Sequence, residues 1–242
     1  EKNATLLFAF VPKLYPIVLT RWEGLDCWNY SPLIYAYKAT DIAITGEGTI
    51  DGNGSNETWW KWCGAPKFGW KEGVGSQKIG RPMLQRWSED GVPVNKRKMG
   101  DGYFMRPQLI NFNQCDGILI EGVTLLRSPF WVIHPLLSQN ITVKRVHIAN
   151  DGPNGDGCDP ESCNKVLIED CFFHTGDDCI AIKSGRNADG RLWNRPSENM
   201  IIRGCTMADG HGGVVVGSEI TGGCRNVFVE NCNMDSPNLE RV

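Results

Sequence analysis

Short β-type runs that recur along the chain constrain its fold more strongly than any other feature. Each run is brief and rich in β-branched residues, and Asn, Asp or Gly bounds it. Near period-two alternation of apolar and polar residues indicates strands. The spacing between the last five copies varies from 24 to 35 residues. The copies begin at Asp41, Asp116, Asn140, Asn164, Asn199 and Asn226.

This spacing predicts an all-β solenoid, a right-handed parallel β-helix formed as a single domain over residues 1–242. Each coil contributes one strand to each sheet, and neighbouring coils lie about 4.8 Å apart. A β-propeller is the alternative architecture, but it requires four strands per repeat and more regular spacing. The recurring Asn has two interpretations, a stacked side-chain ladder or a simple preference for turns.

One segment departs from this rhythm. Residues 53–106 contain five of the nine tryptophans, together with many Gly, Lys and Arg residues. We interpret this segment as a long excursion from the early coils, because long loops within compact domains are usually functional. Its aromatic rings could stack on sugars or form a lid, and local packing is the favoured interpretation for most of them.

Composition excludes several partners. A net charge of −3 argues against nucleic acid, and no stretch approaches the ~20 apolar residues that span a membrane. The ten cysteines contain no pair of Cys-x-x-Cys motifs, which argues against zinc. Because Cys171, Cys205 and Cys232 recur at one place in the repeat, we predict buried core thiols. As an alternative, the sequence allows one or two disulfide bridges among Cys27, Cys63, Cys158, Cys163 and Cys224.

Three polar clusters follow consecutive repeats, and equivalent positions on neighbouring coils lie close together. They predict one acid–base site, since neighbouring carboxylates cannot all ionise and at least one pKa must rise. Calcium binding is one alternative, because hard cations favour clustered carboxylates. A purely structural alternative is that Asp and Gly recur here because they are common wherever coils turn. The clusters are Asn154-Gly-Asp156, Gly176-Asp177-Asp178 and Gly210-His211-Gly212.

These motifs, in this order and spacing, resemble those of family 28 glycoside hydrolases, the polygalacturonase family. The resemblance runs from about residue 5 to the end of the chain. Jointly the motifs are very specific, although each alone is weak. Further matching segments are Thr20–Gly24, Ser128–Trp131, Asp178–Gly185 and Gly204–Ser218.

The resemblance implies hydrolysis of α-1,4 links in a pectic galacturonan, with inversion and with no metal or cofactor. It implies that Asp177 is the general acid, that Asp156 and Asp178 hold the attacking water, and that His211 maintains their protonation. Lys183 could instead be a surface lysine, and His134 a packed histidine. The residues expected to bind substrate are Asn154, His134, Asp159, Lys183 and Gly212.

The family's Arg-x-Lys motif, which binds the substrate carboxylate, normally follows a segment like Ser236–Arg241, and here the sequence ends at Val242. We therefore expect an incomplete chain with impaired catalysis. The long excursion and Gly212–Val216 resemble exo-acting bacterial relatives. The family resemblance also implies a secreted or periplasmic protein, and it sets no oligomeric state. A calcium-dependent, pectate-lyase-like β-helix and a non-catalytic carbohydrate-binding β-helix are the alternative functions.

Overall fold

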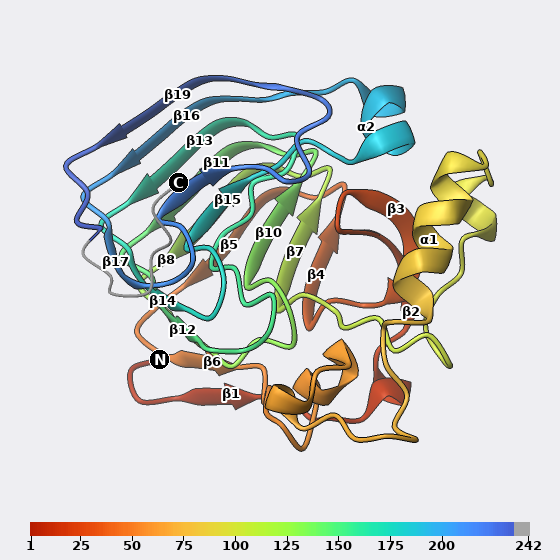
Figure 1. The fold of residues 1–242 in the computed structure, drawn as a ribbon. Coiled ribbons are helices and arrows are strands. Elements are labelled where there is room, and N and C mark those ends of the chain that lie inside the picture. Colours follow the sequence, from red (N-terminus) through yellow and green to blue (C-terminus); the bar gives the residue numbers. More distant parts are fainter. Residues whose placement is uncertain (235–242) are drawn as a thin grey trace.

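In the computed structural model, which describes residues 1–234, parallel strands stack into the sheets of a β-helix (Figure 1). The repeated runs form the most regular sheet, with strand order β19-β16-β13-β11-β8-β5 and parallel pairing throughout. Its strands are β5 (Thr40–Thr45), β8 (Asp116–Glu121), β11 (Gln139–Lys144), β13 (Asn164–Glu169), β16 (Ser197–Arg203) and β19 (Cys224–Glu230).

Two further parallel sheets complete the coils. One contains β1 (Thr5–Leu7), β6 (Thr49–Asp51), β9 (Thr124–Leu126), β12 (His147–Asn150), β14 (Phe172–Thr175) and β17 (Thr206–Asp209). The other contains β4 (Ile34–Tyr37), β7 (Ile110–Asn113) and β10 (Ile133–Leu136), and bridges of Cys158 continue it to β15 (Ile180–Ile182) and β18 (Val214–Val216).

The recurring Asn serves both roles that the sequence allowed. Asn226 Nδ2 donates to Asn199 Oδ1 at 3.1 Å, and Asn199 Nδ2 donates to Asn164 Oδ1 at 2.8 Å. Asn199 and Asn226 also have a positive φ, which Asn tolerates better than most residues. The alignment of Asn164 with Asn199 was wrong by one residue. Asn164 pairs with Glu198, so Lys165 is level with Asn199 and takes the positive φ.

Apolar side chains from the three sheets fill the interior, and cysteines are part of this core. All ten cysteines are free, so none of the bridges that the sequence left open is present. Of the three predicted core thiols, Cys171 and Cys205 are buried, whereas Cys232 is only partly buried. The buried side chains of Cys171 and Cys205 lie at the same place on neighbouring coils. Packing of small apolar thiols therefore explains the cysteine repeat.

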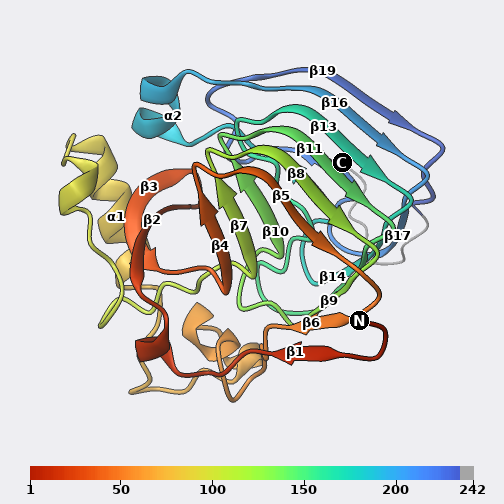
Figure 2. The same cartoon turned by 180° about the vertical axis from the view of Figure 1, so that it is seen from behind.

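Residues between β6 and β7 form short helices on one side of the coils (Figures 1 and 2). These are η2 (Trp60–Cys63), η3 (Pro66–Phe68), α1 (Gly80–Glu89) and η4 (Val94–Lys96). Trp59 and Trp62 are buried and meet edge to face, with ring centroids 5.1 Å apart. Local packing, as predicted, accounts for these two rings.

An antiparallel hairpin of β2 (Ile17–Trp22) and β3 (Leu25–Tyr30) lies beside α1 and α2 (Asn187–Trp193), while η1 (Pro12–Leu14) precedes it (Figure 1). Among residues 1–234, no helix has the length and hydropathy required to cross a membrane. The Ser236–Arg241 segment, on which the carboxylate-binding motif was judged, lies outside the described residues.

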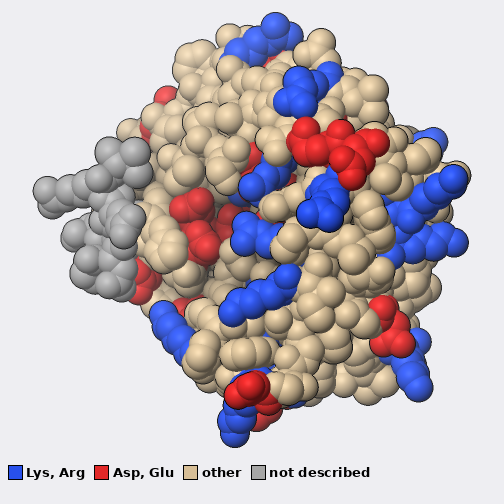
Figure 3. Space-filling model, turned by 45° about the vertical axis from the view of Figure 1, so that its right-hand side comes forward, with Lys and Arg blue, Asp and Glu red and all other residues tan. Residues whose placement is uncertain are grey.

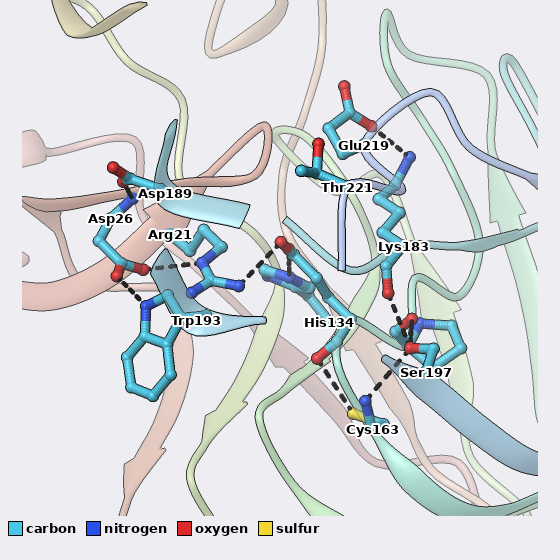
Figure 4. Close-up of polar contacts among 12 residues, drawn as sticks. Arg21, Asp26, His134, Cys163, Lys183, Asp189, Trp193, Ser197, Glu219 and Thr221 are labelled. Carbon is cyan, nitrogen blue, oxygen red and sulfur yellow. Dashed lines mark hydrogen bonds and ion pairs between the residues drawn. The ribbon is translucent and has the colours of Figure 1, made fainter. Parts of the chain in front are cut away.

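A buried ionic network joins the hairpin to the coils (Figure 4). Arg21, on β2, has no exposed surface. Its Nε donates to Asp26 Oδ1 at 2.7 Å, and its Nη1 donates to Glu161 Oε1 at 3.1 Å. Glu161 Oε2 lies 2.8 Å from His134 Nε2. Buried charges of this kind persist only when they are paired, so the network holds hairpin and coil in one position.

A second set of polar contacts joins the excursion, residues 53–106, to the hairpin and to α2. Asp189, on α2, accepts from Arg97 Nη1 at 2.6 Å and from Ser88 Oγ at 2.8 Å. The backbone N–H of Asp26 also donates to Asp189, at 2.8 Å. One buried carboxylate therefore links the excursion, the hairpin and α2.

Candidate active site

The three polar clusters lie at one corner of the β-helix. Each occupies the loop that leaves the sheet of β12, β14 and β17 and enters the sheet of β15 and β18. Oxygen atoms of Asp156, Asp177 and Asp178 lie within 4.8 Å of one another. His211 Nδ1 lies 3.3 Å from Asp177 Oδ1. The structure thus brings together the four residues that the sequence placed in an acid–base site.

A small polar cavity opens in front of this cluster. Its volume is about 140 Å³, below the ~300–1,000 Å³ usual for drug-sized ligands. Figure 3 shows acidic residues in a hollow of the surface, with Lys and Arg side chains beside them. The cavity is lined by Glu23, Arg81, Trp131, Asn154, Asp156, Asp177, Asp178, Lys183, Gly217, Ser218 and Glu219.

Asp156 forms the inner wall, and its side chain is nearly buried. Burial raises its pKa to about 7, while the Lys183 ammonium 3.5 Å away counteracts the shift and the charge of Asp177 adds to it. A carboxyl of this kind holds a proton at pH values where an exposed aspartate has lost it.

Lys183 is buried beneath the cluster and pairs with more than one carboxylate, of which Figure 4 shows Glu219. Its Nζ lies 3.1 Å from Glu219 Oε2 and 3.4 Å from Asp159 Oδ1. Burial alone would lower its pKa, but the attraction of Asp159, Asp156 and Glu219 outweighs burial and raises the pKa well above its ordinary value. Lys183 is therefore a fixed positive charge, and the surface position that the sequence allowed for it is wrong.

Asp178 is more open than Asp156. Burial first, and the charge of Asp177 second, raise the pKa of its carboxyl. Gly212 packs directly against it, because a Cβ at Gly212 would lie 3.1 Å from Asp178 Oδ1 and 2.2 Å from Val215. Gly212 is therefore needed for close packing behind Asp178, whereas the sequence had placed it among the residues that bind substrate.

Two residues expected at the groove are buried instead. His134 has no exposed surface and lies between Asn111 and Glu161, 3.1 and 2.8 Å from them. Asp159 is also fully buried, and burial together with the charge of Asp156 raises its pKa well above the ordinary value. Neither side chain can contact a sugar in this structure. His134 is a packed histidine, which the sequence had allowed as the alternative.

Asn154 does line the cavity, and a buried arginine fixes its orientation. Arg106 Nη2 donates to Asn154 Oδ1 at 2.7 Å, and Arg106 Nη1 donates to the backbone oxygen of Pro153 at 2.6 Å. Burial lowers the pKa of Arg106 to about 10, so the group keeps its charge at neutral pH. Sequence analysis missed Arg106, Arg81 and Glu219, because each is a single charged residue outside the matching segments. Glu23 lies within the matching segment Thr20–Gly24, but the segment indicated no role for it.

The raised pKa of Asp156 predicts how stability depends on pH. The folded state keeps a proton up to about pH 7 that the unfolded chain releases near pH 4. Stability from this group therefore falls as pH rises through this window, by up to about 4 kcal/mol. Asp156→Asn removes the titration, so the melting temperature of the variant minus that of the wild type should increase between pH 4.5 and 8. A constant difference across this range would contradict the assignment.

The fold and the site together define a class, parallel β-helical proteins with a cluster of carboxylates at one corner of the coils. The family model described as glycosyl hydrolases family 28 matches residues 85–240. This range is well over half of the chain, and the chain belongs to glycosyl hydrolases family 28.

Relatives and solved structures agree with this membership. A probable polygalacturonase from Vitis vinifera is 34% identical over 240 residues, which cover 96% of this chain and 42% of that protein. An exo-poly-alpha-D-galacturonosidase from Dickeya chrysanthemi is 26% identical over 95% of this chain and 38% of its own length. The chain thus spans less than half the length of these relatives.

The crystal structure of a hyperthermoactive exopolygalacturonase from Thermotoga maritima superposes with a TM-score of 0.94. It is 47% identical over 95% of this chain and 52% of that chain. The predicted right-handed parallel β-helix is confirmed.

Proposed function

We propose that the protein hydrolyses α-1,4-galacturonosidic bonds of pectin and acts from chain ends. The assembly of Asp156, Asp177, Asp178 and His211 at one corner carries this proposal. Family membership supports the substrate class, and the exopolygalacturonase from Thermotoga maritima supports action on chain ends. A pectic polymer is too large to enter cells, so we also propose that the protein is exported.

In the proposed mechanism Asp177 protonates the leaving glycosidic oxygen. A quarter of its side chain is exposed, whereas Asp156 is nearly buried, so Asp177 is the carboxyl that a glycosidic oxygen can reach. His211 Nδ1 lies 3.3 Å from Asp177 and can adjust its protonation. Asp156 and Asp178 hold the attacking water, and one of them accepts its proton. Burial and the charge of Asp177 raise the pKa of both carboxyls, so a proton taken from the water can be held there.

The stereochemistry is part of the proposal. Inverting enzymes usually separate their carboxyl groups by ~6.5–9.5 Å, and retaining enzymes by ~5–5.5 Å. The oxygens here lie within 4.8 Å, which by itself resembles a retaining pair. We propose inversion because two carboxylates face the same space and can hold one water between them. Family resemblance implies the same outcome.

Product analysis on oligogalacturonides tests this function. We expect the full-length protein to release short products from one end, with the β anomer appearing first in proton NMR. A ladder of product sizes would contradict action on chain ends, and an initial α anomer would contradict inversion. If no new reducing ends appear, the proposal of hydrolysis fails.

Calcium-dependent β-elimination is the second candidate, because three carboxylate oxygens lie close enough to share one cation. The Lys183 ammonium, 3.5 Å from Asp156, already supplies positive charge there and opposes a divalent ion. The same reactions, run with EDTA, distinguish the two. Hydrolysis keeps its rate and gives no near-ultraviolet absorbance, whereas elimination loses its rate and gives an unsaturated product.

A further inference from the structure

Arg81, near the start of α1, is a cation at the cavity with unused hydrogen-bond donors. Its Nε donates to Glu23 Oε2 at 2.7 Å, and 46% of its side chain is exposed. Within residues 1–234, its Nη atoms have no protein partner. A guanidinium has a planar arrangement of donors that matches a carboxylate, so these atoms are suited to an anionic ligand.

The tip of the β2–β3 hairpin fixes the position of Arg81. Glu23 lies at this tip, and its side chain is nearly buried. The backbone of Arg186 donates to Gly24 O at 3.1 Å, and a Cβ at Gly24 would lie 2.6 Å from Arg186 Cβ. Only glycine permits this approach, at a φ of +80°. Glu23 is therefore held at the cavity edge, and Arg81 is held through it.

Two other cations near the cavity, Lys183 and Arg186, are already paired with protein carboxylates, and the buried Arg106 donates to neutral oxygens. Lys183 lies within 3.5 Å of Asp156, Asp159 and Glu219. Arg186 Nη1 lies 3.4 Å from Glu23 and 3.6 Å from Glu219, and 28% of its side chain is exposed. An anionic sugar that approached the carboxylate cluster would meet repulsion from most of the wall. Arg81 is the most exposed of these cations and, unlike Arg186, it lines the cavity.

We propose that Arg81 binds the carboxylate of the uronic acid unit that occupies the cavity, and that Glu23 positions its guanidinium. This inference rests on the proposed function, because it assumes a galacturonate ligand. It gives the Trp-rich excursion, residues 53–106, a direct part in substrate selection. The excursion supplies Arg81, and the carboxylate cluster of the corner loops supplies the chemistry.

Binding measurements test the inference independently of turnover. Isothermal titration uses the Asp177→Asn protein, which should hydrolyse its ligand only slowly, with digalacturonate and with its methyl ester as probes. Adding Arg81→Gln should weaken digalacturonate binding by about 10–100-fold, the effect expected for a lost hydrogen-bonded charge pair. Binding of the neutral ester should change little. Arg81→Lys keeps the charge but not the planar set of donors. Its affinity for digalacturonate should lie between those of the protein that retains Arg81 and of the Arg81→Gln variant.

Arg86→Gln is the matched control, because Arg86 lies on the same helix, is exposed and does not line the cavity. It should leave both affinities unchanged. Equal losses on acid and ester, or no loss on the acid, would overturn the role of Arg81. If digalacturonate binds selectively but the wild type never cleaves it, the hydrolase proposal fails while the role of Arg81 stands.

Discussion

Replacing Asp177 by Asn lowers kcat for oligogalacturonide hydrolysis by about 10²–10⁴-fold, the usual contribution of a general acid. The reason is that an amide cannot protonate the leaving glycosidic oxygen. A leaving group as acidic as dinitrophenol needs no proton, so Asp177→Asn should retain most of its activity on a dinitrophenyl α-galacturonide. The measurement is kcat on both substrates for both proteins.

Two further variants make this result specific to the proposed roles. Asp156→Asn impairs the water-holding side and should lose activity on both substrates. Asp170→Asn is the matched control, since Asp170 is exposed, lies outside the cavity and has a positive φ that Asn tolerates. It should leave kcat unchanged. Equal losses for Asp177→Asn on the two substrates would mean that Asp177 is not the acid.

Replacing Arg21 by Met should destabilise the fold by about 3–5 kcal/mol, because Asp26 and Glu161 would each lose their buried cationic partner. For a chain of this size, that loss lowers the melting temperature by on the order of 10 °C. Thermal unfolding followed by circular dichroism measures the change.

Arg203→Met is the control for this second prediction. Arg203 Nε pairs with Glu169 Oε1 at 2.6 Å, but 45% of its side chain is exposed. Exposed pairs contribute under about 1 kcal/mol, so the melting temperature should move little. If the two variants have the same melting temperature, the buried network of Arg21 does not hold the hairpin against the coils.

Periodicity in the sequence was sufficient to predict the sheets, because each repeated run packs against its copies above and below. Equivalent positions in the repeats also predicted that Asp156, Asp177 and His211 meet at one corner. The pairing of Asn164 was wrong by one residue, since an extra residue before its β-branched run leaves the hydrophobic alternation intact. The burial of Val166 and Ile168, level with Met200 and Ile202, distinguishes the two alignments, as the hydrogen-bond register does.

Burial and long-range pairing could not be predicted in the same way. His134 stands near Trp131 in the sequence, but its burial depends on Asn111 and Glu161, which come from other coils. Arg106 and Arg81 lie in the excursion, where no repeat indicates what they contact. Arg81 pairs with Glu23 of the hairpin and Arg106 bonds Asn154 of a corner loop, and neither contact leaves a local signal.

The corner that holds Asp156, Asp177 and Asp178 is separate in the chain from two segments that complete the cavity wall, the excursion and the hairpin tip. Arg81 and Glu23 come from the excursion and from the hairpin tip, and the coils stack without either side chain. During divergence, insertions and deletions in these outer segments can change which sugar fits, while the strand register stays intact. A lineage can therefore acquire new glycan preferences through changes in these loops, while the carboxylate cluster is inherited unchanged.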